Sequence, residues 1–283
     1  HLQKVLAESA AVNAMINAVQ AEVTTLWPNA KVACYGSRAT GLACSASDVD
    51  LVVTGVASVE HGADMELQLD ELRRLAAKLD GALDGMSSTL QKSSVPIIAL
   101  DAAPPGSSPT TATLHVDISL HTPLHRGLNA ASNVRWLHQA QPLLQPLTLI
   151  LKELLHRHGL KSSFTGGLSS YGLTLMVAHY LLNARVLRIE RLRQQQEATD
   201  NSPLLAEPES VHFSELLFEC LHFYGHVLRP EVHALVWGQH ATGAPRGIIV
   251  HRNQPACAPA SMDPLLVADP VDAMNYVTKG CYR

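Results

Sequence analysis

Apolar and polar residues follow two different periods along this chain, and the change of period divides the chain into two parts. Residues 2–26 and 65–83 carry apolar side chains at the spacing of an amphipathic helix. Between and after them, short apolar runs with strand character occur at 31–35, 48–54, 95–100 and 114–120. The first part is therefore predicted to be an α/β region with a small mixed sheet.

From residue 133 onward the apolar pattern becomes almost wholly helical. The predicted helices span 133–139, 143–158, 169–191 and 213–227. A polar stretch rich in Gln and Glu at 194–210 indicates a surface insertion, and the proline-containing stretch 243–264 indicates irregular structure. The sequence contains no internal repeat. We therefore expect a second, mostly helical domain after the sheet.

Composition favours a packed globular protein. Of the 283 residues, 47% are hydrophobic and 16% are charged, which excludes an intrinsically disordered chain. No run approaches the roughly 20 apolar residues that a membrane helix needs, so no membrane association is expected. The five cysteines are odd in number and form no CxxC pair, which argues against a disulfide framework or a zinc knuckle and fits a reducing, intracellular compartment.

The formal charge and the first residues add two expectations. The net charge of −4 is unusual for a protein that holds nucleic acid by itself, because neutralisation of phosphates dominates that affinity. A chain of this charge that acts on nucleic acid therefore needs a partner protein or a local basic strip to bind it tightly. The chain begins at His1 without a secretory signal, and we expect it to be an excised or processed piece.

The most informative motif is a glycine-serine turn followed by two aspartates. Gly36 and Ser37 lie in the segment YGSRATGL, and Asp48 and Asp50 lie in SDVDLVV. Residues two apart on a strand share a face, so the two carboxylates are expected side by side, where they suit a hard divalent cation. A Gly-Ser turn that opens a helix offers N–H groups and a hydroxyl to phosphate. Each motif alone is common, but together they indicate nucleotidyl transfer.

A third carboxylate follows in the strand-like segment HVDISL. Asp117 is an isolated acid within an alternating run. Alone, it reads equally well as a solvated edge residue. If its strand neighbours the strand of Asp48 and Asp50, three carboxylates converge, and such a triad can hold two magnesium ions.

Taken in order, these motifs resemble those of the DNA polymerase β-like nucleotidyltransferases, and in particular the noncanonical poly(A) polymerase and terminal uridylyltransferase family. The resemblance continues through LILK at 149–152, FTGGLSSYGL at 164–173 and DPVDAMNYV at 269–277, so it spans nearly the whole chain. The segment 164–173 is most similar to the TRAMP-type poly(A) polymerases.

The resemblance implies a fold, a domain organisation and a set of site residues. It implies a catalytic nucleotidyltransferase domain at 21–132 and a helical poly(A)-polymerase-associated domain made of 1–20 and 133–283, with the active site in the cleft between them. It implies Asp48, Asp50 and Asp117 as catalytic residues and ligands of two Mg²⁺ or Mn²⁺ ions. Nucleotide contacts are implied for Gly36, Ser37, Asn129, Lys152, Ser170, Tyr171, Asp272 and Asn275.

Individual members of this set have simpler alternative roles. Asn129 is about equally well explained as a helix cap or turn residue, and Asp272 as a plain loop carboxylate. A second lysine that uridylyltransferases often carry one turn after Lys152 is His156 here. Uridine-specific relatives have a histidine where this chain has Asn275, so the resemblance implies ATP rather than UTP.

The expected activity is template-independent addition of AMP from ATP to an RNA 3′ end, in the nucleus or a mitochondrion. The alternatives are a uridylyltransferase and a catalytically silent RNA-processing scaffold. A small-molecule nucleotidyltransferase shares the GS and DxD core but is not expected to carry the later motifs. The expected partners are RNA, ATP and an RNA-binding protein. We assign no metal site to His222 and His226, because no third ligand is evident.

Overall fold

The computed structural model describes residues 2–44, 47–60, 62, 64–83, 86–92, 95–106, 113–161, 165–183, 212–239, 245–252, 265–272, 275–278 and 281. It divides into two compact units, His1–Ser132 and Asn133–Arg283. This division falls where the hydrophobic period changes along the sequence. Each unit is built around its own hydrophobic core.

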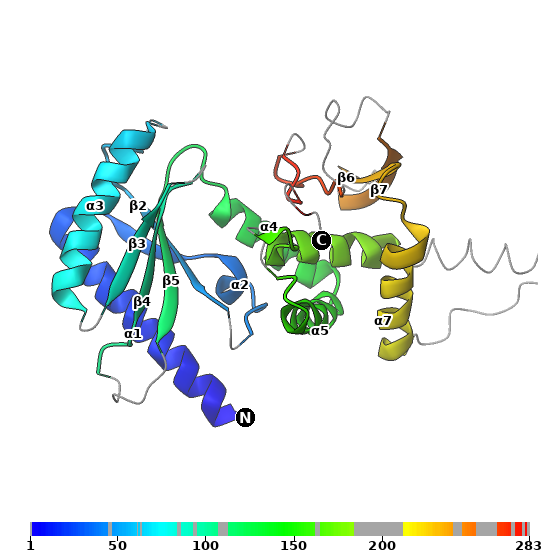
Figure 1. Cartoon of the computed structure of the whole chain (residues 1–283), viewed down its shortest axis with the longest axis horizontal. Helices are drawn as coiled ribbons and strands as arrows, with labels where there is room; N and C mark the ends of the chain where they lie inside the picture. Colours follow the sequence, from blue (N-terminus) through cyan, green and yellow to red (C-terminus); the bar gives the residue numbers. More distant parts are fainter. Residues whose placement is uncertain are drawn as a thin grey trace, which may run out of the picture. The chain divides into compact units, whose positions relative to one another are not determined.

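The first unit contains a five-stranded mixed sheet in the order β1-β2-β5-β4-β3 (Figure 1). The strands are β1 (Lys31–Cys34), β2 (Val49–Thr54), β3 (Ser87–Gln91), β4 (Ile97–Ala102) and β5 (Leu114–Leu120). Only β2 and β5 pair in parallel, and the other neighbours are antiparallel. Four strands lie close to the predicted runs. The edge strand β3 was not predicted, because its sequence SSTLQ is polar and largely exposed and so lacks apolar alternation.

Helices α1 (Leu2–Leu26) and α3 (Met65–Ala82) cover one face of this sheet (Figure 1). Their buried side chains, which include Met15, Val19, Leu72 and Leu75, form one core with alternate residues of the central strands. The alternation of β2 and β5 explains this core, since every second residue faces the helices. The short helix α2 (Gly36–Ala39) follows β1 directly.

The placement of α1 differs from the prediction that residues 1–20 belong with 133–283. The described side chains of α1 pack into the core of the first unit, where Val12, Met15, Val19 and Val23 are buried. Their spacing makes one apolar stripe along the helix, and the sheet is the surface that buries this stripe. Residues 1–132 therefore form one compact unit.

The second unit is largely helical. It contains α5 (Leu144–Arg157), a helix over residues 170–183, α7 (Phe213–His222) and the π-helical turn η2 (Phe223–Val227), while α4 (Gly127–Ala140) runs across the boundary at 132/133. The helix predicted at 133–139 begins earlier, at Gly127. The predicted insertion at 194–210 and the end of the helix predicted at 169–191 lie outside the described residues.

The second unit also contains a β-hairpin that was not predicted. Strands β6 (His233–Gln239) and β7 (Pro245–His251) pair antiparallel, and residue Leu235 makes a further parallel bridge to Val267. Part of this hairpin falls in the stretch that was predicted to be irregular. Pro245 and Gly247 are residues that strands disfavour, so the sequence of β7 lacks a recognisable strand pattern. Its strand conformation is stabilised by pairing with β6.

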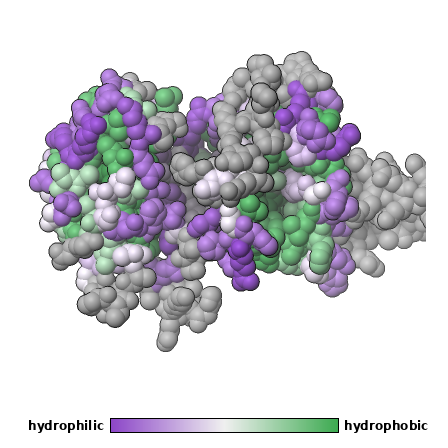
Figure 2. Space-filling view, in the orientation of Figure 1, coloured by the Kyte–Doolittle hydropathy of each residue, from purple (hydrophilic) through white to green (hydrophobic). Residues whose placement is uncertain are grey.

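Some apolar side chains of the second unit stay exposed on α5 and α7. Ile150 and Leu154 on α5 and Phe218 and Leu221 on α7 are exposed, Phe218 by 71%. Figure 2 shows hydrophobic surface in the region of these two helices. In the part of the chain that the structure describes, no helix combines the length and apolar character that crossing a membrane requires.

Candidate active site

The polar residues of the sheet gather on the face opposite to α1 and α3. On β2, Val49, Leu51 and Val53 belong to the helix-covered core, so Asp50 and the preceding Asp48 point the other way. On β5, Val116 and Ile118 are in that core, which places His115 and Asp117 on the opposite face. The strand period, together with the pairing of β2 and β5, thus puts three predicted aspartates on one side of the sheet.

Asp50 and Asp117 are direct neighbours on adjacent strands. The parallel register of β2 and β5 pairs Asp50 with Asp117. Gly36 lies directly against the carboxylate of Asp50: a Cβ built on Gly36 would lie only 2.0 Å from Asp50 Oδ2. Gly36 also has φ +64°, which disfavours any other residue. The glycine of the predicted turn is therefore required both by its backbone conformation and by the acid behind it.

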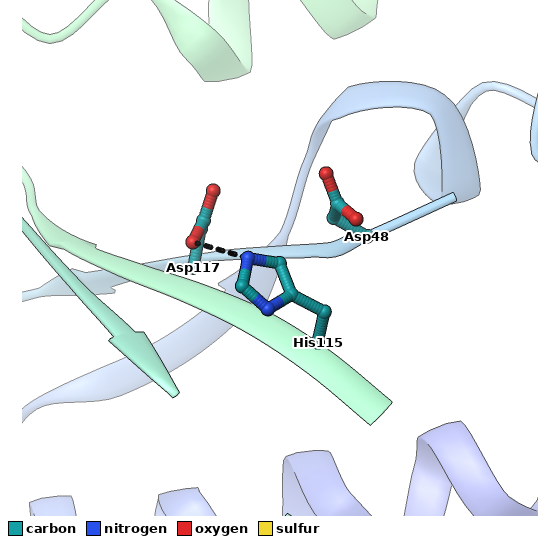
Figure 3. A group of neighbouring side chains, drawn as sticks. All are labelled: Asp48, His115 and Asp117. Atoms are coloured by element: carbon teal, nitrogen blue, oxygen red, sulfur yellow. Dashed lines mark ion pairs between the residues drawn. The ribbon is translucent and has the colours of Figure 1, made fainter. Parts of the chain in front are cut away.

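Asp48, His115 and Asp117 form a compact group at the amino-terminal ends of β2 and β5 (Figure 3). One potential ligand atom from each lies within 4.8 Å of the other two. The carboxylate groups of Asp48 and Asp117 point to the same side in Figure 3, with the imidazole beside them. His115 Nε2 lies 3.7 Å from Asp117 Oδ1, and His115 Nδ1 lies 2.8 Å from Asp101 Oδ1. Asp101 on β4 is the register partner of His115.

The charges of this group act on one another. Burial raises the pKa of Asp117, the neighbouring His115 opposes that rise, and the charges of Asp48 and Asp101 add to it. Burial lowers the pKa of His115, but the hydrogen bond to Asp101 and the charges of Asp117 and Asp48 outweigh burial and raise it overall. These directions are those of a cluster with excess negative charge, which a cation would relieve.

The residues of this group fit a divalent cation. Asp117 Oδ1 is buried and has no hydrogen-bond partner among the described residues. A buried carboxylate oxygen without a donor is costly in free energy, and a metal ion is one species that satisfies it. Carboxylate oxygens are the ligands that Mg²⁺ and Mn²⁺ take in proteins. Asp48 and Asp117 would hold such an ion, with Asp50 beside them in register.

A small polar network lies behind the aspartates. Ser119 Oγ donates to the carbonyl of Leu51 at 3.2 Å and lies 3.1 Å from His125 Nε2. The ring of Tyr35 packs edge-on against His125 at 5.1 Å, and the Tyr35 N–H donates to the carbonyl of Asp50. Burial raises the pKa of Tyr35 to about 12, and burial lowers that of His125 to about 4. These neutral side chains support the backbone that carries Asp50.

In the second unit, one buried aspartate joins two predicted nucleotide-binding residues. Asp269 is 3% exposed; its carboxylate accepts from the Tyr171 hydroxyl at 3.0 Å and from Asn275 Nδ2 at 3.3 Å. The backbone N–H of Val271 donates to the same carboxylate at 2.9 Å, and Asn275 N donates to the carbonyl of Asp272 at 2.8 Å. Tyr171, Asp272 and Asn275 are thus brought together around Asp269.

The remaining predicted residues occupy separate positions. Ser37 lies in α2, and its carbonyl accepts from the N–H of Leu42 at 2.9 Å. Asn129 is exposed in the first turn of α4. Lys152 is buried in α5, at 8% exposure, and Ser170 is exposed at the first residue of the helix 170–183.

Three residues at these sites were missed from the sequence. His115 lies two residues before Asp117, so the strand period that puts Asp117 on this face also applies to His115. Asp101 carries no motif signal, since its role depends on the antiparallel register of β4 and β5. Asp269 begins the DPVDAMNYV motif, but only its burial shows that it positions its neighbours.

The chain is similar to proteins that are named poly(A) RNA polymerases. Residues 2–125 match the family model described as "Poly(A) RNA polymerase, mitochondrial-like, central palm domain". The chain is 29% identical over 220 residues to poly(A) RNA polymerase cid14 of Schizosaccharomyces pombe and 31% identical over 180 residues to poly(A) RNA polymerase protein 2 of Saccharomyces cerevisiae. These alignments cover 77% and 63% of this chain, and 28% of each relative.

A further relative has a different description. The chain is 29% identical over 212 residues to the "Inactive non-canonical poly(A) RNA polymerase protein Trf4-2" of Drosophila melanogaster, over 74% of this chain and 44% of that protein. The matched region is therefore less than half the length of each of these three relatives.

Solved structures share the fold. The polymerase core of TRAMP, an RNA surveillance complex, superposes on this chain with a TM-score of 0.68 at 23% sequence identity. The match covers 100% of this chain and 76% of the TRAMP chain. A variant of the Cid1 poly(U) polymerase bound to MgATP superposes with a TM-score of 0.70 at 20% sequence identity. This match covers 96% of this chain and 82% of the Cid1 chain. The resemblance predicted from the motifs is thus confirmed: residues 2–125 match the palm-domain model of the mitochondrial-like poly(A) RNA polymerases, and the chain shares the fold of these solved structures.

Proposed function

We propose that this chain is the core of an RNA 3′-terminal nucleotidyltransferase that adds AMP from ATP without a template. The observation that supports this proposal most strongly is the single sheet face that carries Asp48, Asp50 and Asp117 with Gly36 against Asp50. Relatives over 63–77% of the chain are named poly(A) RNA polymerases. Because the chain matches only part of each relative, the activity of the whole protein belongs to this proposal.

In the proposed mechanism, Asp48, Asp50 and Asp117 would hold two Mg²⁺ or Mn²⁺ ions. Bound ions of this kind activate a 3′-hydroxyl and neutralise charge on a triphosphate. Gly36 permits close approach of phosphate oxygens to the backbone of the turn, and Ser37 donates a hydroxyl to them. Lys152 supplies a point charge for the triphosphate. In-line displacement then depends mainly on positioning and charge, which these residues provide.

We assign nucleotide recognition to residues of the second unit. Tyr171 stacks on the base, an interaction of about 1–3 kcal/mol that does not depend on base identity. Ser170 contacts phosphate, and Asn129, which belongs to the first unit, contacts the sugar. Asn275 and Asp272 discriminate the base edge, and Asp269 holds Tyr171 and Asn275 in place through its two carboxylate oxygens. Solved structures of the Cid1 poly(U) polymerase include a histidine-to-asparagine variant bound to MgATP and a complex with Mg 3′-dATP.

The decisive experiment is extension of a labelled oligoadenylate primer with Mg²⁺ and each of the four ribonucleotides separately. Long products with ATP alone are expected. Asp48→Ala combined with Asp50→Ala should abolish extension without loss of folding, whereas Asp80→Ala, which removes an exposed carboxylate on α3, should leave it unchanged. Activity that survives in the double variant would sink the assignment.

The same assay tests the uridylyltransferase alternative. Products with UTP would keep the mechanism and overturn the choice of base. The variant Asn275→His is expected to lower the ratio of ATP to UTP incorporation at least tenfold, and an unchanged ratio removes Asn275 from base selection.

A catalytically silent scaffold is the second candidate function, and one relative that is named inactive favours it. All three aspartates are present in this chain, which argues for catalysis. No extension with any nucleotide, with or without added RNA-binding proteins, would support the scaffold.

We also propose that a partner protein supplies RNA affinity, in a nuclear or mitochondrial compartment. The net charge of −4 gives little attraction to phosphate, and exposed apolar side chains on α5 and α7 offer surface for a protein partner. The structurally similar TRAMP core belongs to an RNA surveillance complex. RNA binding by the isolated chain at nanomolar concentration and physiological salt would contradict this proposal.

A further inference from the structure

His115 presents one ring nitrogen to each of two carboxylates. Its Nδ1 lies 2.8 Å from Asp101 Oδ1, and only a protonated nitrogen can donate to a carboxylate, so this contact takes the Nδ1–H. Its Nε2 faces Asp117 Oδ1 at 3.7 Å, which is too long for a hydrogen bond. Figure 3 shows this edge of the ring turned toward Asp117.

A positive charge on this side of the ring, either a proton on Nε2 or a metal ion, would favour this arrangement of the two atoms. Asp117 Oδ1 is buried and has no hydrogen-bond partner among the residues that the structure describes. A ring nitrogen with a lone pair and a carboxylate oxygen do not attract each other at this distance unless a cation lies near both. Asp48 offers a third donor atom within 4.8 Å of the others. Two metal–ligand bonds of about 2.1 Å each span at most about 4.2 Å, so small side-chain rotations would bring the three atoms onto one ion.

We propose that His115 is a nitrogen ligand of the metal site, positioned by Asp101, and that it shifts the preference of this site from Mg²⁺ toward Mn²⁺. Asp101, His115 and the ion would form the carboxylate–histidine–metal arrangement in which the outer acid fixes the tautomer and orientation of the ring. Mn²⁺ takes carboxylate oxygens as Mg²⁺ does, but as a first-row transition metal it also accepts an imidazole nitrogen, whereas Mg²⁺ keeps to oxygen ligands. The inference rests on the carboxylates of the proposed function, but metal binding alone tests it.

The competing interpretation is a doubly protonated His115 that forms ion pairs with Asp101 and Asp117. In that case the ring carries its own proton at Nε2, and any bound ion is held by carboxylate oxygens without nitrogen. The two interpretations differ in a spectroscopic property, because a bound nitrogen couples magnetically to Mn²⁺.

The experiment uses the whole chain without nucleotide or RNA. Mn²⁺ binding is measured by the electron paramagnetic resonance signal of free Mn²⁺, and Mg²⁺ binding by competition. Electron spin echo envelope modulation of bound Mn²⁺ then reports on ¹⁴N. The variants are His115→Ala and Asp101→Ala, with His251→Ala as the matched control, since His251 is also an exposed histidine on a strand and lies in the other unit.

We expect ¹⁴N modulation in the unmodified chain and in the His251 control, and its loss in His115→Ala. That variant should bind Mn²⁺ at least roughly tenfold more weakly and Mg²⁺ within about twofold of the unmodified chain, and Asp101→Ala should weaken Mn²⁺ binding roughly tenfold. Absence of ¹⁴N modulation, an unchanged Mn²⁺ to Mg²⁺ affinity ratio in His115→Ala, or absence of Mn²⁺ binding would each overturn the proposal.

The measurement on the unmodified chain does not depend on how a variant folds. It also separates this inference from the proposed function. A chain that extends RNA but shows no nitrogen ligation refutes only the role of His115, and a chain that binds Mn²⁺ through nitrogen but extends no primer refutes only the polymerase activity.

Discussion

At the scale of single residues, Gly36 shows how closely the turn and the acidic face depend on each other. Its positive φ and the 2.0 Å approach of Asp50 Oδ2 to the position of a Cβ are two separate reasons for glycine. Gly106 has a similar φ of +72° but open space around it. A substitution at Gly106 therefore tests the cost of the backbone conformation alone, whereas one at Gly36 adds a clash with the Asp50 carboxylate.

We predict that Gly36→Ala abolishes primer extension and lowers the free energy of unfolding more than Gly106→Ala does. Both variants place a Cβ in the left-handed region, at a cost of about 1–2 kcal/mol, but only Gly36→Ala also displaces the Asp50 carboxylate. Denaturant unfolding and the extension assay measure the two effects. Equal destabilisation with full activity in Gly36→Ala would contradict the proposed role of this turn.

His179 predicts how stability depends on pH. The side chain is fully buried beside Trp237, and burial lowers the pKa of His179 to about 4. A histidine in the unfolded chain titrates near about 6.5. Between these values the unfolded state binds a proton that the folded state does not, so the free energy of unfolding falls as pH falls through this window.

The predicted loss from this one group is on the order of 3 kcal/mol between pH 6.5 and 4. In His179→Phe, which keeps an aromatic ring beside Trp237, this part of the pH dependence should disappear. The exposed His251 gives the control variant His251→Phe, which should retain it. Unfolding measured at several pH values decides, and parallel pH profiles for His179→Phe and the unmodified chain would refute the prediction.

At the scale of elements, the start of α3 shows a local device that the sequence specifies. Asp64 precedes the helix, and its side chain accepts from the N–H groups of Glu66 and Leu67 at 2.9 and 3.1 Å. These are two of the N–H groups that a helix leaves without a partner in its first turn. Asp80 lies near the other end of the same helix and does not cap these N–H groups.

We predict that Asp64→Ala lowers the free energy of unfolding by about 1 kcal/mol, because it removes this cap. Asp80→Ala should be neutral or slightly stabilising, since it removes a negative charge near the negative end of the helix dipole. Denaturant unfolding of the two variants compares them directly, and a smaller loss for Asp64→Ala than for Asp80→Ala would show that the cap contributes little.

At the scale of the whole molecule, the described parts of the two units have separate cores, and the second unit has a smaller further apolar cluster that includes Val236 and Tyr276. Leu72 lies fully buried in the core of the first unit and Leu147 in that of the second. Each unit is thus stabilised mainly by its own apolar contacts. A cavity in one core should weaken the unit that contains it more than the other.

We predict that Leu72→Ala and Leu147→Ala each cost about 2–5 kcal/mol of local stability. Hydrogen exchange should rise mainly within 2–132 for Leu72→Ala and mainly within 133–283 for Leu147→Ala. An equal rise over both units in both variants would show a single cooperative unit instead.

Much of the fold could be predicted because it depends on local patterns. The predicted runs agree with β1, β2, β4 and β5 and with helices α1, α3, α5 and α7, since period and burial are encoded residue by residue. The edge strand β3 and the hairpin of β6 and β7 were missed, because their hydrogen bonds come from partner strands rather than from an apolar pattern.

The sequence by itself determined the order of the motifs, the shared side of Asp48 and Asp50 on their strand, and the resemblance to noncanonical poly(A) polymerases. Only the tertiary structure decided that Asp50 pairs with Asp117, that Asp101 holds His115, and that Asp269 joins Tyr171 to Asn275. The reason is physical. Side-chain direction along a strand or helix follows from local geometry, whereas register and distant hydrogen bonds depend on how segments far apart in the chain pair and pack.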